Sequence, residues 1–359
     1  MKTKKILFLI NDITMPGGLS RVTLNLVKEF DFLSDEFEVH ALSATAKFQS
    51  SNHQNIHYLN LPALHGLTAV EKICWYRMLK SRVEEYVEEN QYDLVISVGT
   101  AMVICTSFCC FHKAELWGAE HLAYNHYGRF RKFLKRWRYP KLTRLICLTE
   151  SDKELHYDKY LSQVSVIPNF TEFAEIDTTY SNKASILFVG RFNRMKGVDY
   201  LVDIIKCVSE QCPRWHFNLY GEGAMKLWME EQISKSELSA YVTIHNPTKH
   251  ISLVYQQSGI FILTSRNEGF PMVLLEAQAH GVPVVSFDCE TGPSEIITDG
   301  EDGYLIPPFD TQAFADRLAE LVNDGDLRKS MSEQALINRQ RFDKSSIISL
   351  WLALFRKSL

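Results

Sequence analysis

The sequence predicts an α/β protein built from two doubly wound parallel-sheet domains. Its 359 residues exceed the roughly 150 residues of a typical single domain. Hydrophobic residues make up 46% of the chain and charged residues 23%, which suffices for two buried cores. Short apolar, β-branched runs alternate with helical stretches, as in parallel sheets covered on both faces. The polar stretch Thr171–Lys183 separates two such series, so we expect domains over residues 1–172 and 173–344.

Each of the short apolar runs is expected to be a strand. In the first domain these runs are Ile6–Ile10, Glu38–Ser43, Asn55–Leu59, Asp93–Val98, His121–Tyr124, Arg144–Leu148 and Gln163–Ile167. In the second they are Ser185–Val189, Trp215–Tyr220, Val242–His245, Gly259–Leu263 and Val282–Phe287. Residues Ser345–Phe355 show helical spacing of apolar side chains. We expect a helix over 345–357 that packs back onto the first domain.

Charge and cysteine content exclude several classes of protein. The net charge is −4, divided into +2 over residues 1–172 and −6 over the remainder, so nucleic acid is not an expected partner. The eight cysteines include no Cys-x-x-Cys pair, which favours reduced thiols over disulfides or a zinc site. The run Ile6–Ile10 is shorter than the roughly 7–15 apolar residues of a secretion signal, so a cytoplasmic location is expected.

The segment TSRNEGFPMVLLEAQAHGVPVVSF carries two glutamates at a suggestive spacing. Glu268 precedes a helix expected to begin at Pro271 and to end before Gly281, and Glu276 lies on that helix. The two are at most about 12 Å apart along the axis, roughly the span from a sugar across a pyrophosphate to a ribose. Free N–H groups around 270–273 would face the phosphates. The alternative is two solvated surface carboxylates, and the spacing alone does not decide between these interpretations.

This segment resembles the E-x7-E motif of glycosyltransferase family 4, whose members are retaining enzymes with the GT-B fold. Further stretches resemble that family in the same order. These are MPGGLSRVTLNLVKEF, SVIPNF with Asn169, SILFVGRFNRMKGVDYLVDI, NLYGEGAMK and DCETGPSEIITDGEDGYLIP. The resemblance covers nearly the whole chain. It implies an acceptor-binding and a donor-binding Rossmann-like domain that face a central cleft.

The resemblance also implies roles for individual residues. Glu276 would bind ribose hydroxyls, and Glu268 would bind hydroxyls of the transferred sugar or stabilise positive charge at its anomeric carbon. The amides of Gly269 and Phe270 would meet the pyrophosphate. The base would lie near His245–Thr248, among apolar side chains and backbone groups.

Arg191 and Lys196 supply the positive charge that a departing nucleoside diphosphate requires. Enzymes of another fold hold a metal ion for this purpose, whereas here a guanidinium and an ammonium group are expected to replace it, with no cofactor. As mere surface cations at a helix start, they would oppose the helix dipole. A bound anion would resolve that conflict.

Two glycines and two histidines are weaker candidates in the first domain. Gly17 and Gly18 follow a strand and open a helix, so their amides could approach a ligand, although a turn without a ligand is the alternative. The fingerprint GxGxxG is absent, which argues against a nicotinamide dehydrogenase. The family carries a histidine after the strand near 115–124, and His121 matches best, with His126 second. A neutral imidazole there could bind a sugar hydroxyl or move the acceptor proton, and an ordinary loop histidine is the alternative.

Residues 128–144 hold eight Arg or Lys and no acid, with Phe130, Phe133, Leu134 and Trp137 on one helical face. An anionic membrane would suit the cations. A domain helix with its aromatic stripe in the core is the alternative. We favour a combination in which the cations touch lipid while the aromatic side chains are buried.

The sequence thus predicts a metal-independent retaining glycosyltransferase. It would move a hexose or N-acetylhexosamine from a UDP-sugar or related donor to a glycan or lipid-linked acceptor of surface polysaccharide or lipopolysaccharide, at the inner face of the plasma membrane. A GT-B nucleotide-sugar epimerase and a non-catalytic two-lobed sugar-binding protein are the alternatives.

Overall fold

A computed structural model describes residues 3–15, 18–33, 36–45, 54–64, 66–171 and 183–359. The chain divides into two compact units. Unit 1 comprises Met1–Asn169 together with Ile347–Leu359, and unit 2 comprises Phe170–Ser346. Most of the stretch expected as a linker, 171–183, lies outside the described residues.

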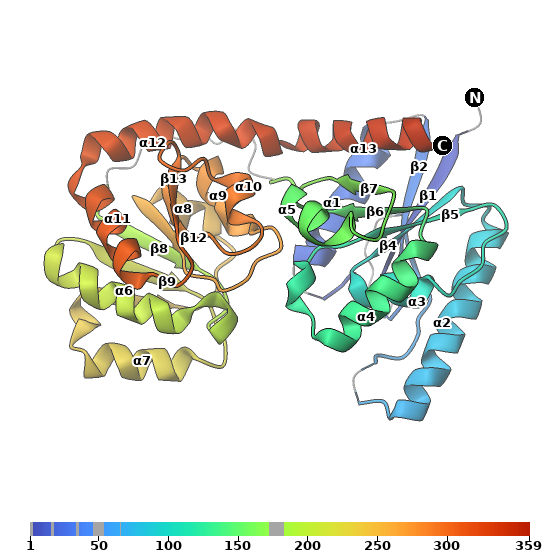
Figure 1. Ribbon diagram of the computed structural model, residues 1–359, viewed down its shortest axis with the longest axis horizontal. Coiled ribbons are helices and arrows are strands. Elements are labelled where there is room, and N and C mark those ends of the chain that lie inside the picture. The colour runs from blue at the N-terminus through green and yellow to red at the C-terminus, as the bar shows by residue number, and fades with distance from the viewer. Residues whose placement is uncertain (1–2, 16–17, 34–35, 46–53, 65, 172–182) are drawn as a thin grey trace. The chain divides into compact units, whose positions relative to one another are not determined.

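Unit 1 contains a seven-stranded parallel sheet in the order β3-β2-β1-β4-β5-β6-β7 (Figure 1). The strands are β1 (Lys4–Ile10), β2 (Phe37–Ser43), β3 (Ile56–Tyr58), β4 (Leu94–Val98), β5 (Glu115–Ala119), β6 (Arg144–Cys147) and β7 (Val164–Val166). The helices are α1 (Gly18–Leu33), α2 (Ala69–Glu89), α3 (Thr100–Thr106), α4 (Arg129–Arg138), α5 (Glu150–Asp152) and the final helix α13 (Lys344–Ser358).

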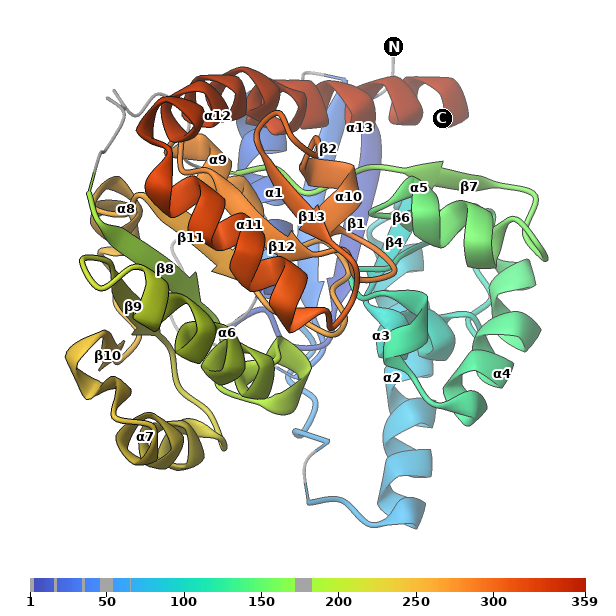
Figure 2. The same cartoon turned by 60° about the vertical axis from the view of Figure 1, so that its left-hand side comes forward.

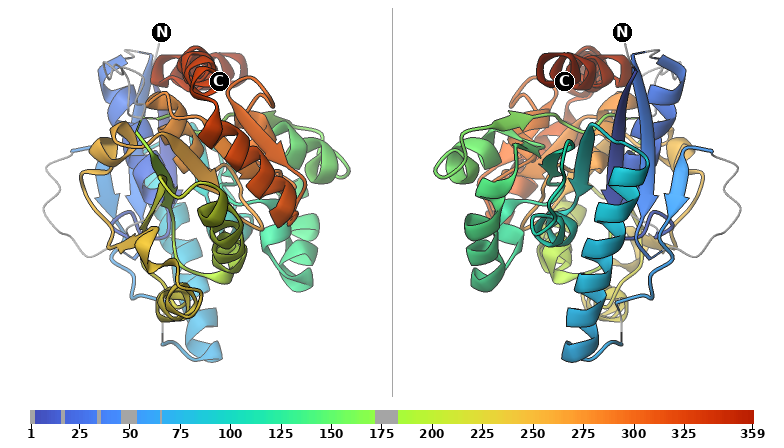
Figure 3. Two further views of the ribbon diagram at one scale, coloured as in Figure 1. Left: turned by 90° about the vertical axis from the view of Figure 1, so that its left-hand side faces the viewer. Right: turned by 90° about the vertical axis from the view of Figure 1, so that its right-hand side faces the viewer.

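Alternate side chains of β1 enter the two apolar layers of unit 1, as the two-residue period of a strand requires. Leu7 and Leu9 pack with Trp75 and Leu79 of helix α2, which runs alongside the sheet (Figure 3). Phe8 points the other way, and its ring lies 5.8 Å from that of Trp351 on α13. The last helix of the chain therefore completes the core of unit 1.

Unit 2 contains a six-stranded parallel sheet in the order β10-β9-β8-β11-β12-β13. The strands are β8 (Ser185–Val189), β9 (His216–Tyr220), β10 (Val242–His245), β11 (Ile260–Leu263), β12 (Val284–Phe287) and β13 (Gly303–Ile306). The helices are α6 (Val198–Gln211), α7 (Lys226–Lys235), α8 (Ile251–Gln256), α9 (Met272–Ala279), α10 (Pro293–Ile296), α11 (Thr311–Asn323) and α12 (Gly325–Asn338). Helices α6 and α11 cover one face of this sheet, with α8 and α9 on the other (Figure 2). Both sheets are doubly wound, as predicted.

The strand predictions are confirmed with one exception. The run 121–124 is not a strand, because β5 lies earlier, at Glu115–Ala119, and 121–124 belongs to the loop that follows it. This strand was not predicted because it contains Gly118, and glycine is rare in strand interiors. A Cβ at Gly118 would lie 2.8 Å from the Cγ1 atom of Val103 on α3, so any larger residue would force neighbouring side chains to move. Strand β13 had not been predicted.

Two further expectations concern the chain as a whole. All eight cysteines are free thiols, as their spacing predicted. Among the described residues, no helix combines the length and the apolar character needed to cross a membrane.

Candidate functional site

The carboxylate of Glu268 is the centre of a polar cluster in unit 2. Its Oε1 atom accepts hydrogen bonds from the Nζ atom of Lys196 and from the Oγ atom of Ser265, each at 2.5 Å. The side chains of Lys196 and Glu268 are 24% and 10% exposed, so the pair is reachable from solvent. The structure thus brings together two residues that the sequence had suggested from motifs 72 positions apart.

A glycine allows the loop of Lys196 to approach the loop of Glu268. Lys196 ends a 3-10 turn, Arg194–Lys196, in which the Asn193 side chain accepts a hydrogen bond from the Lys196 amide. Gly197 follows with φ of 66°, and a Cβ there would lie 1.8 Å from the carbonyl oxygen of Thr264. The hydroxyl of Thr264 donates to the Lys196 carbonyl at 2.9 Å. Only glycine permits this contact.

Arg266 fastens the same two loops together. Its guanidinium donates two 2.6 Å hydrogen bonds to the carboxylate of Asp199 on α6, and a third to the carbonyl of Arg194. It also stacks 4.0 Å from the ring centre of Tyr200. The hydrogen bonds from Arg266 lower the pKa of Asp199. Sequence reasoning missed this clamp, because nothing in the two motifs indicates that these side chains pair.

Arg191 is exposed in the loop that follows β8, and its side chain makes no hydrogen bond or ion pair with any described residue. Its backbone is held by the turn after β9. The Phe192 amide donates to the carbonyl of Glu222, and a Cβ at Gly221 would lie 1.9 Å from the carbonyl oxygen of Gly190. A rigid backbone therefore presents a cation that is available to a ligand.

Helix α9 begins one residue later than predicted, with Pro271 as its N-cap, and ends at Ala279. Gly281 lies just beyond its C-cap, and its φ of 62° is typical of that position. The amides of Gly269, Phe270, Met272 and Val273 donate to no acceptor among the described residues. Unsatisfied N–H groups at a helix start form a place for an anion. The expectation that amides around 270–273 are free is confirmed.

Glu276 is buried on α9, and its environment is polar. The hydroxyl of Tyr255, on α8, donates to its Oε2 atom at 3.1 Å. The ring of Tyr255 stacks on that of His280, whose Nδ1–H donates to the Glu276 carbonyl at 2.7 Å, while Ser252 bonds to its Nε2 atom at 2.8 Å. Burial lowers the pKa of His280. His280 is the C-cap of α9. No pattern in the sequence had singled out Tyr255.

Unit 1 carries the remaining candidate residues. His121 lies in the loop after β5. Its Nδ1 atom is buried and has no hydrogen-bond partner among the described residues. Burial lowers its pKa to about 4, so the ring is neutral at pH 7. His126 is exposed in a 3-10 turn, Gly18 is the first residue of α1, and Gly17 lies outside the described residues.

Helix α4 corrects the expected placement of its aromatic stripe. Phe130, Phe133 and Trp137 are 73%, 62% and 55% exposed, so they are not in the core. The fully buried residue of this helix is Lys135, which pairs with the carboxylate of Glu120. That buried carboxylate draws the side chain of Lys135 inward, while Arg129, Arg131 and Arg136 stay exposed. The outer face therefore carries aromatic rings together with several Arg and Lys side chains.

Two acidic stretches have structural roles. Within Asp299–Asp302, the Asp299 carboxylate accepts a hydrogen bond from the Leu305 amide, and the Asp302 carboxylate accepts one from the Thr298 amide, so both stabilise a turn. The chain also contains one Asp-x-Asp sequence, which begins at Asp324, and there the carboxylate caps α12 by accepting from the Leu327 amide. Within the described ranges, no three His, Cys, Asp or Glu side chains are grouped as metal ligands.

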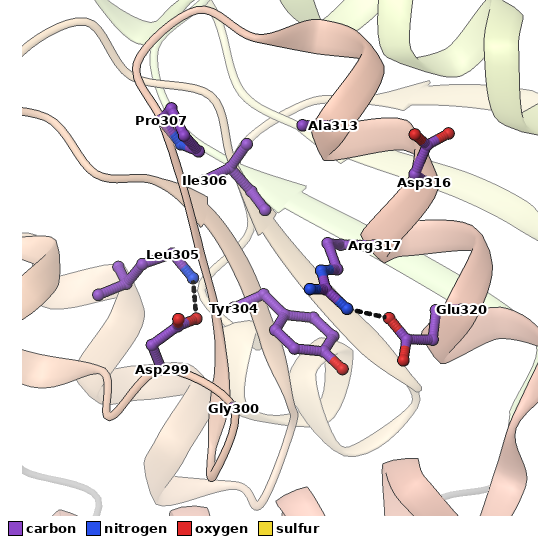
Figure 4. A pocket seen from close by; sticks show the side chains of 10 residues that line it. All are labelled: Asp299, Gly300, Tyr304, Leu305, Ile306, Pro307, Ala313, Asp316, Arg317 and Glu320. Atoms are coloured by element: carbon purple, nitrogen blue, oxygen red, sulfur yellow. Dashed lines mark hydrogen bonds and ion pairs between the residues drawn. The ribbon is translucent and has the colours of Figure 1, made fainter.

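A surface cavity of about 570 Å³ lies between β13 and α11, apart from the residues predicted for the site. Arg317, paired with Glu320, stacks over the ring of Tyr304 at its wall (Figure 4). Its lining contains none of the cations or free amides described above.

The ends of β9 and β10 carry a stacked pair of rings in the region expected to meet the base. The rings of Tyr220 and His245 are 4.3 Å apart and nearly parallel, and the Nε2 atom of His245 hydrogen-bonds the side chain of Asn218 at 3.0 Å. A flat aromatic surface is therefore present beside residues 245–248.

Residues 169–337 match the family model described as glycosyl transferases group 1, and this span includes every site residue of unit 2. The chain is 28% identical over 367 residues to the amylovoran biosynthesis glycosyltransferase AmsD of Erwinia amylovora, covering 97% of this chain and 98% of that protein. It is 25% identical over 291 residues to an α-1,4-N-acetyl-D-galactosaminyltransferase of Campylobacter jejuni that acts on a diNAcBac-PP-undecaprenol-linked glycan, covering 78% and 80%.

Among solved structures, the fold is similar to that of a point mutant of TarM from S. aureus in complex with fondaparinux, α-GlcNAc-glycerol and UDP. The TM-score is 0.80 at 16% identity, covering 98% of this chain and 100% of the other. At this identity the similarity establishes the fold.

Proposed function

Because the chain is a glycosyltransferase with the GT-B fold and a group 1 domain, we propose that it is a retaining, metal-independent sugar transferase that uses a UDP-sugar. It moves a hexose or N-acetylhexosamine to a hydroxyl of a glycan or lipid-linked acceptor in surface polysaccharide biosynthesis. One observation carries this proposal. Lys196 and Glu268 form a reachable ion pair whose loop continues directly into the free amides before α9.

The donor is bound along this loop. The amides of Gly269 and Phe270, with Lys196 and Arg191, surround the diphosphate with positive charge. Glu268 accepts hydrogen bonds from sugar hydroxyls, and Glu276 does so from the ribose. The stacked rings at the ends of β9 and β10 lie beside the base.

In the reaction, the bond between the anomeric carbon and the phosphate oxygen breaks, and the acceptor oxygen bonds to the same carbon. Attack from the face of the leaving group retains the anomeric configuration. The departing phosphate oxygen takes the acceptor proton, while Arg191 and Lys196 stabilise its charge. His121, neutral at pH 7, hydrogen-bonds the donor sugar near the reacting carbon.

The acceptor follows from the relatives and from α4. The Erwinia relative takes part in amylovoran biosynthesis, and the Campylobacter relative transfers a sugar to an undecaprenol-linked glycan. The exposed rings and cations of α4 suit an anionic membrane, where each cation adds about 1 kcal/mol. We therefore assign the enzyme to the cytoplasmic face of a membrane that carries a lipid-linked acceptor.

The experiment is a thermal-shift panel of UDP, GDP and ADP, each with its sugars and with EDTA present. UDP compounds should raise Tm most, and the shift should vanish in Arg191→Ala/Lys196→Ala with the fold retained. Turnover with a lipid-linked acceptor should follow the same donor preference, persist in EDTA and give a product of unchanged anomeric configuration. Loss of turnover in EDTA, or isomerised sugar nucleotide formed without acceptor, would replace this proposal, the second result by an epimerase.

A further inference from the structure

A buried ion pair in unit 1 lies outside the donor chemistry described above. The Nζ atom of Lys135 on α4 is 3.2 Å from the Oε1 atom of Glu120, and the two side chains are 0% and 1% exposed. Both residues are fully surrounded by protein, unlike the pair in unit 2.

Two hydroxyl groups also donate to the Glu120 carboxylate. The hydroxyl of Thr100 donates to Oε2 at 2.5 Å, and the hydroxyl of Tyr139 donates to Oε1 beside Lys135. Lys135 in turn is surrounded by aromatic rings, and the Tyr157 hydroxyl lies 3.3 Å from its Nζ atom. The ring centres are 4.9–5.7 Å from Nζ and belong to Tyr124, Tyr127, Tyr139 and Tyr157.

A buried ion pair of this kind adds little net stability to the fold. Removing two charges from water costs several kcal/mol per ion, and apolar replacements of buried pairs are often neutral or stabilising. A buried ion pair can instead favour one local conformation, because any other conformation would separate the two charges. The position of Glu120 shows which geometry is fixed.

Glu120 follows the last residue of β5 and directly precedes His121. Its amide donates to the carbonyl of Ile146 at 2.9 Å, so backbone and side chain are both anchored. At the other end of the loop, the amide of Tyr124 donates to the carboxylate of Asp152 at 3.1 Å. The short segment that carries His121 is therefore fastened at both ends by buried carboxylates.

We infer that Glu120 and Lys135 are positioning residues, which hold the loop of His121 so that the imidazole is presented to the substrate. The inference rests on the role proposed for His121. The pair acts through the backbone of the loop and not by contact with substrate. Removing both charges should therefore change the orientation of His121 while leaving the binding of UDP, whose proposed contacts all belong to unit 2, intact.

The test is Glu120→Gln/Lys135→Met, which removes both charges and keeps similar volumes. We expect Tm at or above that of the parent, UDP affinity within twofold and a kcat at least tenfold lower. His121→Ala should lower kcat similarly, and adding it to the double variant should cause no further loss, because both changes remove the same contribution. The surface pair variant Glu150→Gln/Lys153→Met, in the same unit, is the matched control and should behave as wild type.

A second measurement does not depend on turnover. In protein with 13C-labelled histidine, the ring signal of His121, assigned with His121→Gln, should shift in the double variant and stay in place in the control. A parental kcat in the double variant, a further tenfold loss on adding His121→Ala, or an unmoved His121 signal would each overturn the inference. Absence of any transfer by the wild type would count against the proposed function instead, and the His121 signal would still decide the positioning role.

Discussion

The two units each contain a lysine–glutamate pair, and the pairs differ in their access to solvent. Lys196 and Glu268 of unit 2 are 24% and 10% exposed, whereas Lys135 and Glu120 of unit 1 are 0% and 1% exposed. Glu268 has one further side-chain donor, Ser265, and its loop leads into amides without acceptors. Glu120 has two further side-chain donors, Thr100 and Tyr139, so three groups in all bond its carboxylate.

Because of this difference in exposure, Lys196 and Glu268 can exchange each other for a ligand, whereas Lys135 and Glu120 cannot. A phosphate or sugar hydroxyl can replace one member of the exposed pair at little cost, since water already competes for both charges. Breaking the buried pair leaves a charge with no solvent to receive it. The same two residue types therefore give a ligand site in one unit and a structural anchor in the other.

The largest expected effect comes from breaking the buried pair on one side only. Lys135→Met leaves the Glu120 carboxylate unpaired, so the free energy of unfolding should fall by about 3–5 kcal/mol. Urea denaturation of the variant and of Glu120→Gln/Lys135→Met measures this. The single variant should be the less stable of the two, and a loss below about 1 kcal/mol would show that the pair is not the buried anchor described here.

The corresponding change in the exposed pair should affect activity and spare stability. Lys196→Ala should lower kcat by about 10²–10³-fold, because a charge that meets the leaving diphosphate is lost. Its unfolding free energy should change by less than about 1 kcal/mol, since the pair is partly hydrated. Initial rates and melting curves test both, with Lys206→Ala on α6 as control. A stable variant with parental kcat would contradict the phosphate role.

Two glycines sharpen the geometric part of the comparison. Gly197→Ala should lose at least about 2 kcal/mol, because the residue has positive φ and the new methyl group would collide with the Thr264 carbonyl. Gly300 also has positive φ, but a Cβ there meets nothing within 4 Å. Gly300→Ala should therefore lose less, and only Gly197→Ala should also weaken UDP binding. Equal losses would mean that the close approach of the two loops is unimportant.

The burial of His121, which follows Glu120 in the chain, can be tested by measuring stability against pH. The folded-state pKa of His121 is about 4, below the 6.5 of the unfolded chain. Between these values the unfolded state binds a proton that the folded state does not, so this contribution is complete above pH 6.5 and is lost as pH falls toward 4. The stability of wild type relative to His121→Gln should therefore be about 2 kcal/mol greater at pH 7 than at pH 4.5. A difference that does not change with pH would contradict the burial of the ring.

The smallest effect concerns a carboxylate that belongs to neither pair. Tyr255→Phe removes the hydroxyl that donates to Glu276 at 3.1 Å. We expect a loss of about 1 kcal/mol of UDP binding, near fivefold in Kd, with kcat retained. Calorimetry with UDP measures this, and Tyr160→Phe, whose hydroxyl has no described partner, serves as control. Equal UDP affinity in wild type and Tyr255→Phe would remove Tyr255 from the site.

Much of unit 2 could be predicted because its chemistry lies in short segments. The motifs around Lys196 and Glu268 each contain the residue, its turn and the adjacent helix start. Their pairing could not be predicted, because it depends on the contact between Gly197 and the Thr264 carbonyl across the sheet edge. Arg266 and Asp199 form their clamp for the same spatial reason.

In unit 1 the prediction that the aromatic side chains of α4 are buried was wrong. A lysine is normally a surface residue, so the basic side of the helix was taken as the outer one. The partner of Lys135 is a glutamate on another element, at the end of β5, and no periodic pattern connects them. Apolar spacing predicts which residues can share a face, but a buried charge elsewhere decides which face turns inward.

The chain path through the two units has a consequence for biosynthesis. Unit 2 is one uninterrupted stretch, Phe170–Ser346, inserted into unit 1, whose core also needs the rings of Trp351 and Phe355 on α13. The core of unit 2 is complete without residues 347–359, whereas the core of unit 1 is not. Premature termination a few codons short of residue 351 should therefore spare the later-made unit and leave the earlier one as a substrate for chaperones and proteases.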